Sequence, residues 1–305
     1  MIVLVKDIKE ATCVTHSGTM HADEVFATAF LDLYLKDIKI CRTLNINEVE
    51  NDNVIVYDIG RGKYDHHQLD AQKRENGITY SSFGLLWKEF GKKYLEEKNI
   101  EYIEDVFQGV DKDLVEAIDA DDNGVFPKIE AEYKVKTLSN VIKLFNPSYK
   151  SNKDSDLQFM KAVTFAREIL EEEIETIIGK VKAKYQVLEI INQQEGTNLI
   201  LPEYMPYEDT VLSEEKANNF NFVIFPSNRG GYNIKTLAKS QEDKTSRKEF
   251  PAEWAGLVDD ELEQVTGITG ARFCHSTRFL VSCDSLETAL KLIDKALSSE
   301  INKEQ

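Results

Sequence analysis

The amino-acid sequence predicts an α/β protein with a parallel-sheet domain, a smaller α/β carboxyl-terminal domain, and a long helix joining them. The first half alternates short apolar runs, rich in β-branched residues, with segments of helical periodicity. A single helical pattern covers residues 157–193, and the last third returns to pairs of strand-like runs. We therefore place one domain at residues 1–195, including the connecting helix, and the second at residues 196–305.

In the first domain, apolar side chains recur at helical spacing from Ala22 to about Lys36, so a helix is expected there. Residues 81–129 carry a mostly helical pattern, and the polar, turn-rich residues 145–156 interrupt it. The buried strands, which are rich in β-branched residues, are expected at 11–15, 38–43 and 53–58.

Two strand pairs and a terminal helix are predicted in the second domain. The first pair is joined by SNRGG, a turn in which Gly230 or Gly231 adopts a positive φ. The helix begins with Ser285, Leu286 and Glu287, which resemble a helix cap. The strands are expected at 221–226, at 232–238 and as a pair within 271–283, and the helix at 285–298.

The composition limits the classes of partner. Fifty-four acidic against 37 basic residues give a net charge of −17, so a phosphate-bearing substrate must be bound locally, by metal or by a few basic side chains. The amino terminus lacks a signal or transit pattern, and no apolar run approaches membrane-spanning length. The four scattered cysteines are expected to be reduced core thiols. We therefore expect a cytoplasmic protein with no membrane partner, whose oligomeric state the sequence leaves open.

Four of the five histidines lie in two short segments. In the first, His16 follows the strand predicted at 11–15, while His21, Asp23 and Glu24 lie where the next helix begins. Two histidines five residues apart would point about 140° away from each other on a helix, so a loop is expected to bring them together.

The second histidine segment follows another predicted strand. Asp58 ends that strand, and a loop with two glycines leads to Asp65, His66 and His67. Open α/β sheets bind ligands outside the carboxyl ends of their strands. Both histidine segments are therefore expected to meet at one edge of the sheet.

A third acidic segment, EAIDADDNG, ends a predicted helix with Asp119, Asp121 and Asp122. Acidic side chains at a helix carboxyl end are unfavourable unless a cation neutralises them. Mixed imidazole and carboxylate ligands suit Mn, Zn or Fe, and bridging carboxylates also suit Mg. Two ions about 3.5–4 Å apart would activate a water and hold a phosphoryl group, which predicts phosphoester hydrolysis. The candidate ligands are His16, His21, Asp23, Asp58, His66 and an aspartate from 119–122, with Asp119 and Asp122 as the choices.

Several of these residues also have ordinary explanations. Chance placement explains the two histidine segments poorly, because their residues fall at strand ends. Glu24 either orients a metal ligand or is a favourable acid in a first helical turn. The lone His275 is explained as well by an ordinary surface or core position as by a functional role. Solvated charges are the expected state of Asp70, Asp111 and Asp113.

The Asp65–His66–His67 triplet resembles the signature of the DHH phosphoesterase superfamily. Over nearly the whole chain, the sequence is similar to the melanocyte-proliferating-gene family of DHH-like metal-dependent hydrolases. The resemblance implies a parallel-sheet DHH-type catalytic domain, a smaller carboxyl-terminal domain with substrate between them, and 3′-to-5′ exonuclease activity on RNA. The motifs that carry it are THSGTMHADE, VYDIGRGKYDHHQ, SSFGLLW, IDADDNG, FPAEWAGL and GITGARFCHSTRF.

The resemblance also implies roles for the clustered residues. Asp58 would bridge two metals, and His67 would face the phosphate or orient the leaving group. The first metal would have His16, His21 and Asp58 as ligands. The second would have Asp23, Asp58, His66 and either Asp119 or Asp122.

One departure from the superfamily pattern concerns the metal. The usual pattern is a histidine followed by Asp-x-Asp, and His21-Ala22-Asp23 stands in its place. A histidine ligand in place of aspartate shifts the expected preference of the first site towards Zn, Co or Fe. Two divalent ions are expected, with Mn²⁺ favoured and Mg²⁺, Co²⁺, Zn²⁺ or Fe²⁺ as the alternatives.

The motif GITGARFCHSTRF resembles the loop with which DHH-associated domains hold substrate. Arg272, His275 and Arg278 are then candidates for phosphate contacts, since a guanidinium can bind two phosphate oxygens at once. A β-hairpin with solvated arginines is the alternative.

The leading hypothesis is a metal-dependent phosphodiester hydrolase, a 3′-to-5′ exonuclease on RNA or short oligonucleotides, with His67 and Asp58 as catalytic residues. The net charge of −17 favours a second candidate, a small-molecule phosphatase acting on pyrophosphate or a cyclic dinucleotide. A third candidate is a metal-loaded module that binds a nucleotide without hydrolysing it.

Overall fold

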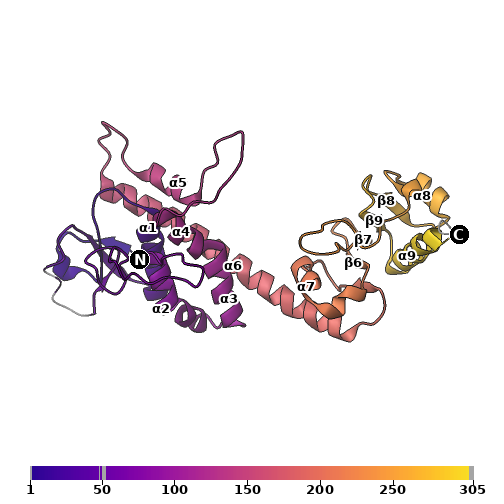
Figure 1. Ribbon diagram of the computed structural model, residues 1–305, viewed down its shortest axis with the longest axis horizontal. Helices are drawn as coiled ribbons and strands as arrows, with labels where there is room; N and C mark the ends of the chain where they lie inside the picture. Colours follow the sequence, from indigo (N-terminus) through magenta and orange to yellow (C-terminus); the bar gives the residue numbers. More distant parts are fainter. Residues whose placement is uncertain (1, 48, 50–52, 302–305) are drawn as a thin grey trace. The chain divides into compact units, whose positions relative to one another are not determined.

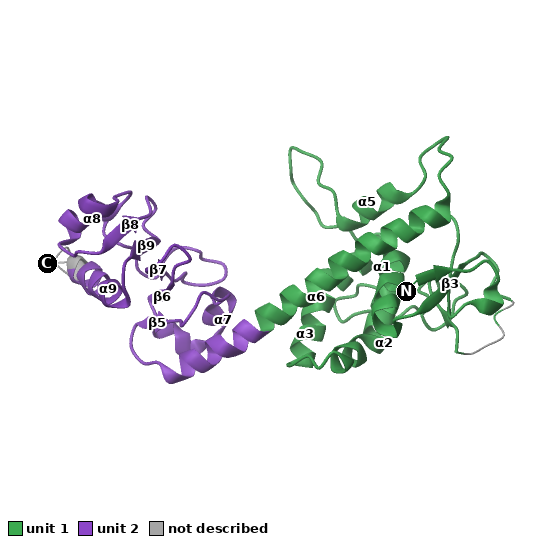
Figure 2. Ribbon diagram, turned by 180° about the vertical axis from the view of Figure 1, so that it is seen from behind, with its two compact units in different colours: residues 1–181 green, residues 182–305 purple. Residues whose placement is uncertain are grey.

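The computed structural model describes residues 2–47, 49 and 53–301 (Figure 1). The chain divides into two compact units, Met1–Val181 and Lys182–Gln305, which Figure 2 colours separately. The division falls inside α6, Ser155–Gln193, a continuous helix of 39 residues. The helix predicted from residues 157–193 is therefore confirmed, while the predicted functional boundary after residue 195 stays a prediction.

The first unit contains a four-stranded sheet in the order β1-β3-β2-β4, with every pair parallel. The parallel sheet is thus confirmed. The predicted strand at 53–58 is reduced to two residues, and the amino-terminal strand β1 was not predicted. The strands are β1 (Ile2–Leu4), β2 (Cys13–Thr15), β3 (Ile38–Arg42) and β4 (Ile55–Val56).

The helix α1 (Ala22–Leu35) follows β2 and is buried on nearly all sides. It packs against α2 (Ser82–Glu97), where the ring of Phe30 lies 5.2 Å from that of Trp87 between ring centroids. A helix that is apolar all round must be buried. The N-cap and first turn of this buried helix carry two of the candidate metal ligands, His21 and Asp23, together with Glu24.

The helix α3 (Ile103–Val110) runs without a break into a π-helical turn, η2 (Asp111–Val115), and then into α4 (Glu116–Asp122). The helical pattern predicted to residue 129 is wrong beyond Asp122. Gly124 adopts a φ of 72° and ends the helix, and the apolar residues that follow it are exposed rather than packed on a helix face. Shorter elements of the unit are η1 (Ile8–Glu10), α5 (Leu138–Ile142) and η3 (Lys143–Phe145).

The second unit contains a five-stranded sheet in the order β5-β6-β7-β9-β8. Only β5 and β6 run parallel, and the other pairs are antiparallel. The turn between β6 and β7 has φ values of 81° at Gly230 and 78° at Gly231, as predicted. The strands are β5 (Asn198–Ile200), β6 (Phe222–Pro226), β7 (Tyr232–Thr236), β8 (Ala271–Cys274) and β9 (Leu280–Cys283).

Two apolar clusters pack on the second sheet. One contains Ile234, Val281 and Trp254 together with residues of α8 and α9, and the other contains Val223, Phe225 and the last turns of α6. All four cysteines are buried free thiols. Among the described residues, no helix is both long and apolar enough to span a membrane. The helices are α7 (Glu208–Ser213), η4 (Glu215–Asn219), η5 (Ala252–Trp254), α8 (Asp259–Thr266) and α9 (Leu286–Ile301).

Candidate metal centre

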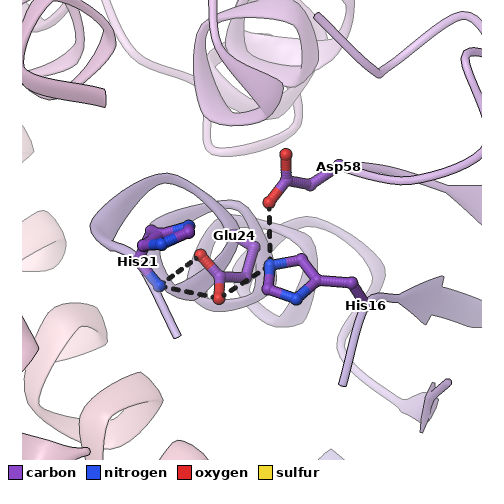
Figure 3. A group of neighbouring side chains, drawn as sticks. All are labelled: His16, His21, Glu24 and Asp58. Atoms are coloured by element: carbon purple, nitrogen blue, oxygen red, sulfur yellow. Dashed lines mark hydrogen bonds and ion pairs between the residues drawn. The ribbon is translucent and has the colours of Figure 1, made fainter. Parts of the chain in front are cut away.

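Four side chains meet where β2, α1 and β4 end or begin, and Figure 3 shows them pointing towards one another. His16 follows β2, and its Nε2 lies 3.1 Å from Oδ2 of Asp58 and 3.2 Å from Oε1 of Glu24. Glu24 also caps α1, because its oxygens accept the backbone N–H of His21 at 2.8 and 2.9 Å. The two early histidines are therefore brought together by a loop, as predicted, with their ring centroids 5.8 Å apart.

The carboxylate of Asp58 faces both histidine segments. While Oδ2 faces His16, Oδ1 lies 3.3 Å from Nε2 of His66 and 3.8 Å from Nδ1 of His67. Asp58 adopts a left-handed backbone with φ of 55°, which is uncommon outside glycine and turns the chain at the end of β4. This position makes Asp58 the residue shared by two possible ligand groups.

A further group surrounds His66. Its Nε2 lies 3.2 Å from Oδ2 of Asp122 and 3.9 Å from Oδ2 of Asp23. Asp122 ends α4, and Asp23 lies in the first turn of α1, so two helix ends close this side of the cluster. His21, Asp23 and Asp122 also have possible ligand atoms within 4.8 Å of one another.

Surrounding polar groups orient these side chains. Nδ1 of His16 lies 3.2 Å from the carbonyl of Ser17, and Nδ1 of His66 lies 3.3 Å from Oδ1 of Asn123. In a neutral imidazole with its proton on Nδ1 facing such an acceptor, the Nε2 lone pair points into the cluster, as a metal-binding imidazole requires. The hydroxyl of Ser82 donates to Oδ2 of Asp23 at 2.8 Å.

The residues fit a pair of divalent cations. Among the described residues, Oδ1 of Asp23 is buried without a hydrogen-bond partner, and Oδ1 of Asp58 and Nε2 of His66 are buried with only their mutual 3.3 Å contact. Buried polar atoms are nearly always well satisfied, so such atoms in one cluster suit an electrophile. Imidazole nitrogens with carboxylate oxygens form a donor set suited to Mn²⁺, Fe²⁺ or Zn²⁺.

The closely packed charges shift one another's pKa. Burial opposes a charge on either imidazole, but contacts with Asp58 and other carboxylates raise the pKa of His16 to about 11 and that of His66 to about 9. Burial raises the pKa of Glu24 to about 8 and, with nearby carboxylates, that of Asp122 to about 8. Against burial, both histidines lower the pKa of Asp58 to about 2. A cation binding here must therefore displace protons.

His67 lies at the edge of the cluster, with its side chain 58% exposed. Its Nδ1 lies 2.6 Å from Oδ1 of the buried Asp65, so the ring is held with Nε2 directed away from that carboxylate. Burial opposes the charge on Asp65, but the hydrogen bond from His67 lowers the pKa of that carboxyl below its usual value. This arrangement suits a group that exchanges a proton at Nε2.

Asp119 lies outside the ligand groups. Its carboxylate accepts from Arg74 Nη2 at 2.6 Å, from the hydroxyl of Ser81 at 2.6 Å and from the backbone N–H of Gly84 at 3.1 Å. It thus binds the N-terminus of α2, where a negative charge is favourable. Between the two candidate aspartates, the structure brings Asp122 and not Asp119 to the other predicted ligands.

The basic residues predicted to bind substrate lie in the second unit. Arg272 is exposed, and its Nη1 donates to the carbonyl of Gly230 at 2.9 Å. Arg278 forms an ion pair with Glu249, and Nδ1 of His275 lies 2.8 Å from the Thr277 hydroxyl. The substrate-binding roles of Arg272, His275 and Arg278 stay predictions.

Sequence reasoning missed two of the polar groups that orient the cluster. Ser82 belongs to SSFGLLW and Asn123 to IDADDNG, so both lie in motifs that were recognised without a role for these residues. Glu24 was left open between two roles, and in the structure its carboxylate both caps α1 and contacts His16.

The sequence profile of a known family, MYG1_exonuc, described as uncharacterised protein family UPF0160, matches residues 12–297 of this chain. The chain belongs to the MYG1 family. The match includes every residue of the candidate metal centre and every predicted substrate-binding residue of the second unit.

Relatives of similar length occur in distant organisms. The MYG1 protein of Dictyostelium discoideum is 27% identical, over 95% of this chain and 98% of the relative. The MYG1 exonuclease of Homo sapiens is 28% identical, over 93% of this chain and 85% of the relative. The MYG1 protein of Chlamydia trachomatis is 27% identical, over 94% of this chain and 96% of the relative. MYG1 proteins thus share their sequence over both units of this chain.

Proposed function

We propose that this MYG1-family chain is a metal-dependent phosphodiester hydrolase, a 3′-to-5′ exonuclease that uses two divalent cations to shorten RNA or short oligonucleotides. The observation that carries the proposal is the position of Asp58. Its two carboxylate oxygens face two different imidazoles, His16 at 3.1 Å and His66 at 3.3 Å, as a bridging ligand would. The mammalian relatives named MYG1 exonuclease support nuclease activity.

In this proposal, the cluster residues divide between two cations. His16, His21 and Asp58 would hold one, with Glu24 contacting or orienting this group. Asp23, Asp58, His66 and Asp122 would hold the other. Bound there, divalent cations supply Lewis acidity and lower the pKa of a coordinated water. Mn²⁺ is the favoured ion, because it suits both the mixed imidazole and carboxylate ligands and a shared carboxylate; Mg²⁺, Co²⁺, Zn²⁺ and Fe²⁺ are the alternatives.

The chain's own groups position the substrate and move the proton. Asp65 fixes the imidazole of His67 through the 2.6 Å contact at Nδ1, which leaves Nε2 to contact a phosphate oxygen or protonate the leaving hydroxyl. The hydroxyl of Ser82 and the amide of Asn123 fix Asp23 and His66, so the cluster does not have to reorganise when substrate arrives.

The experiment that tests the proposal compares substrates. An end-labelled oligoribonucleotide, a cyclic dinucleotide and pyrophosphate are each incubated with the protein and Mn²⁺, and again with excess chelator. We expect stepwise shortening of the oligoribonucleotide from its 3′ end, abolished by the chelator. Intact oligonucleotide after hours with Mn²⁺ would instead indicate a binding module without hydrolysis.

A small-molecule phosphatase is the second candidate, and the net charge of −17 is the observation that favours it. A long polyanion is repelled by such a chain at low ionic strength, whereas a small substrate is repelled less. Faster hydrolysis of pyrophosphate or the cyclic dinucleotide than of the oligoribonucleotide would select this function.

A further inference from the structure

The second unit has a groove on one face of its sheet, with a volume of about 570 Å³. Small-molecule and cofactor sites commonly have volumes of about 300–1,000 Å³, so the groove is large enough for a nucleotide. Its lining contains two arginines, Arg229 and Arg272, and among the described residues that line it there is no Asp or Glu. A local cationic surface of this kind contrasts with the net charge of −17 of the chain.

The floor of the groove is a row of side chains across four strands. Phe225 on β6 pairs with Asn233 on β7, Asn233 pairs with Ser282 on β9, and Ser282 pairs with Phe273 on β8. All four line the groove. Side chains of consecutive strand residues point to opposite faces, and the neighbours of this row, including Ile234 and Val281, are buried in the core. The row therefore presents the partly exposed side chains of Asn233, Ser282 and Phe273 to the groove, while Phe225 is buried at its end.

One wall of the groove carries an exposed aromatic ring. Tyr204 is 62% exposed, and its ring lies 5.3 Å from that of Phe225 between centroids, at an interplanar angle of 60°. An exposed ring supported from one side by another ring is a surface on which a nucleobase can stack, and such stacking accepts any base.

The arginines of the groove lie at the turn between β6 and β7. Ser227 and Gly231 close this turn with a 2.9 Å backbone hydrogen bond, which leaves Arg229 exposed at its tip. Arg272 reaches the same turn from β8 and donates to the carbonyl of Gly230 at 2.9 Å. Gly231 has a φ of 78°, and a Cβ there would lie 2.0 Å from the carbonyl oxygen of Cys283, so glycine is needed to keep this turn against β9.

We infer that this groove binds single-stranded nucleic acid, with Tyr204 stacking on a base and Arg229 and Arg272 contacting the phosphates. The inference deepens the proposed function and rests on it for the class of substrate. Guanidinium groups bind phosphate oxygens in a bidentate manner, and Asn233 and Ser282 can hydrogen-bond to base or sugar edges. Stacking requires an unpaired base, so the groove selects single strands over duplexes.

The test measures binding without cleavage. A fluorescent single-stranded oligoribonucleotide is titrated with the full-length protein in excess chelator, and its anisotropy gives the affinity. We expect Tyr204→Leu to weaken binding about tenfold, whereas Tyr204→Phe, which keeps the ring, retains it. Arg229→Ala should also weaken binding, and it should reduce the slope of log affinity against log salt by about 0.7 for each lost phosphate contact.

Lys291→Ala is the matched control for Arg229→Ala. It removes one positive charge from the exposed face of α9, where Lys291 pairs with Glu287, so affinity should stay unchanged. The inference is wrong if Tyr204→Leu and Arg229→Ala bind like the wild type, if a duplex binds as tightly as the single strand, or if polyglutamate competes as well as RNA. The variant Arg272→Ala is secondary, because it also loses the hydrogen bond to the turn.

A second measurement separates this inference from the proposed function. Hydrolysis of bis(p-nitrophenyl) phosphate with Mn²⁺ reports on the metal centre without requiring a nucleobase. If the wild type hydrolyses bis(p-nitrophenyl) phosphate but the groove variants bind RNA as the wild type does, the nucleic-acid role of the groove is wrong and the proposed function stands. Groove-dependent binding of RNA in chelator, with no hydrolysis of either substrate in Mn²⁺, would support the groove and overturn the proposed function.

Discussion

Oδ1 of Asp65 lies 2.6 Å from Nδ1 of His67 and 3.1 Å from the backbone N–H of the same residue. The other carboxylate oxygen accepts the backbone N–H of Arg61 at 2.6 Å. The carboxylate is thus bound on both sides and holds one exposed imidazole in a fixed orientation. It makes Asp65 a positioning residue for His67.

The first prediction concerns this pair. Asp65→Asn should lower kcat at least about tenfold, because the amide no longer selects the ring tautomer with the proton on Nδ1. Metal content, measured by atomic emission, should stay at the wild-type value. The control is Asp70→Asn, an exposed aspartate in the same loop, which should leave turnover unchanged. Equal turnover in the Asp65 variant would remove the positioning role.

The second prediction concerns the shared carboxylate. Asp58→Asn should reduce the bound metal and lower turnover by about a thousandfold or more. The reason is that removing one member of a set of residues that acts as a unit costs nearly as much activity as removing the whole set. Asparagine tolerates the left-handed backbone that Asp58 adopts, so the variant should fold. Asp113→Asn, whose native side chain pairs with Lys180 on the surface, is the control. Full activity in Asp58→Asn would contradict a bridging role.

The third prediction separates two aspartates that lie one helical turn apart. Asp119→Asn should lower the free energy of unfolding by about 3 kcal/mol, because it removes a fully buried carboxylate that pairs with Arg74 and accepts hydrogen bonds from Ser81 and Gly84. Among the described residues, Arg74 then keeps only its ion pair with Asp111. Asp122→Asn should lower metal affinity and leave the metal-free stability nearly unchanged. Denaturant unfolding in chelator, together with metal titration of each folded variant, measures both effects. Loss of metal affinity in the Asp119 variant at full stability would reverse the assignment.

The fourth prediction concerns pH and cation binding. Protons on His66, whose pKa is about 9, and on Glu24, whose pKa is about 8, compete with a cation at neutral pH. The affinity for Mn²⁺ should therefore rise from about pH 6 to about pH 8, up to about tenfold per pH unit for each displaced proton. Calorimetric titration in buffers of different ionisation enthalpy counts the released protons. Binding with no proton release would contradict these shifts.

The fifth prediction is the matching change in stability when chelator is present. Glu24 holds its proton to about pH 8 in the folded protein against an ordinary value of 4.5, so stability should decline as pH rises between these values. The raised pKa of His16 acts in the same direction: its contribution is complete below about pH 6.5 and is lost as pH rises towards 11. Melting temperature should thus fall from pH 6 to pH 9 in chelator, and Mn²⁺ should restore more of it at pH 9. A melting temperature that rises from pH 6 to pH 9 in chelator would contradict the raised pKa values of Glu24 and His16.

Local pattern predicted much of the first unit. The helix expected from Ala22 begins at that residue, and the strand ends placed His16 and Asp58 within 3.1 Å of each other. The prediction succeeded because the carboxyl ends of parallel strands lie at the same edge of a sheet, so residues that follow those strands come close together. The amino-terminal strand was not predicted; it lies at an edge of the sheet, and its side chains are exposed or only partly buried.

The choice between Asp119 and Asp122 was beyond sequence reasoning. Residues three apart on a helix point to similar sides, so their spacing does not show which of these two aspartates faces the other ligands. What separates them is Arg74, which is distant in the sequence and binds Asp119, together with the backbone of α2. Tertiary partners of this kind carry no local pattern. The same reason explains why the roles of Ser82 and Asn123 became visible only in the folded chain.

The π-helical turn at Asp111–Val115 sets the rotation of the α4 side chains about the helix axis relative to those of α3. Removing one residue to restore an ordinary α-helix would rotate Asp122 by about 100° relative to α3 and turn its carboxylate away from His66. Single-residue deletions should therefore be tolerated in the exposed loop after Gly124 and not in this turn. The number of residues in the turn determines which way the side chains of α4 point.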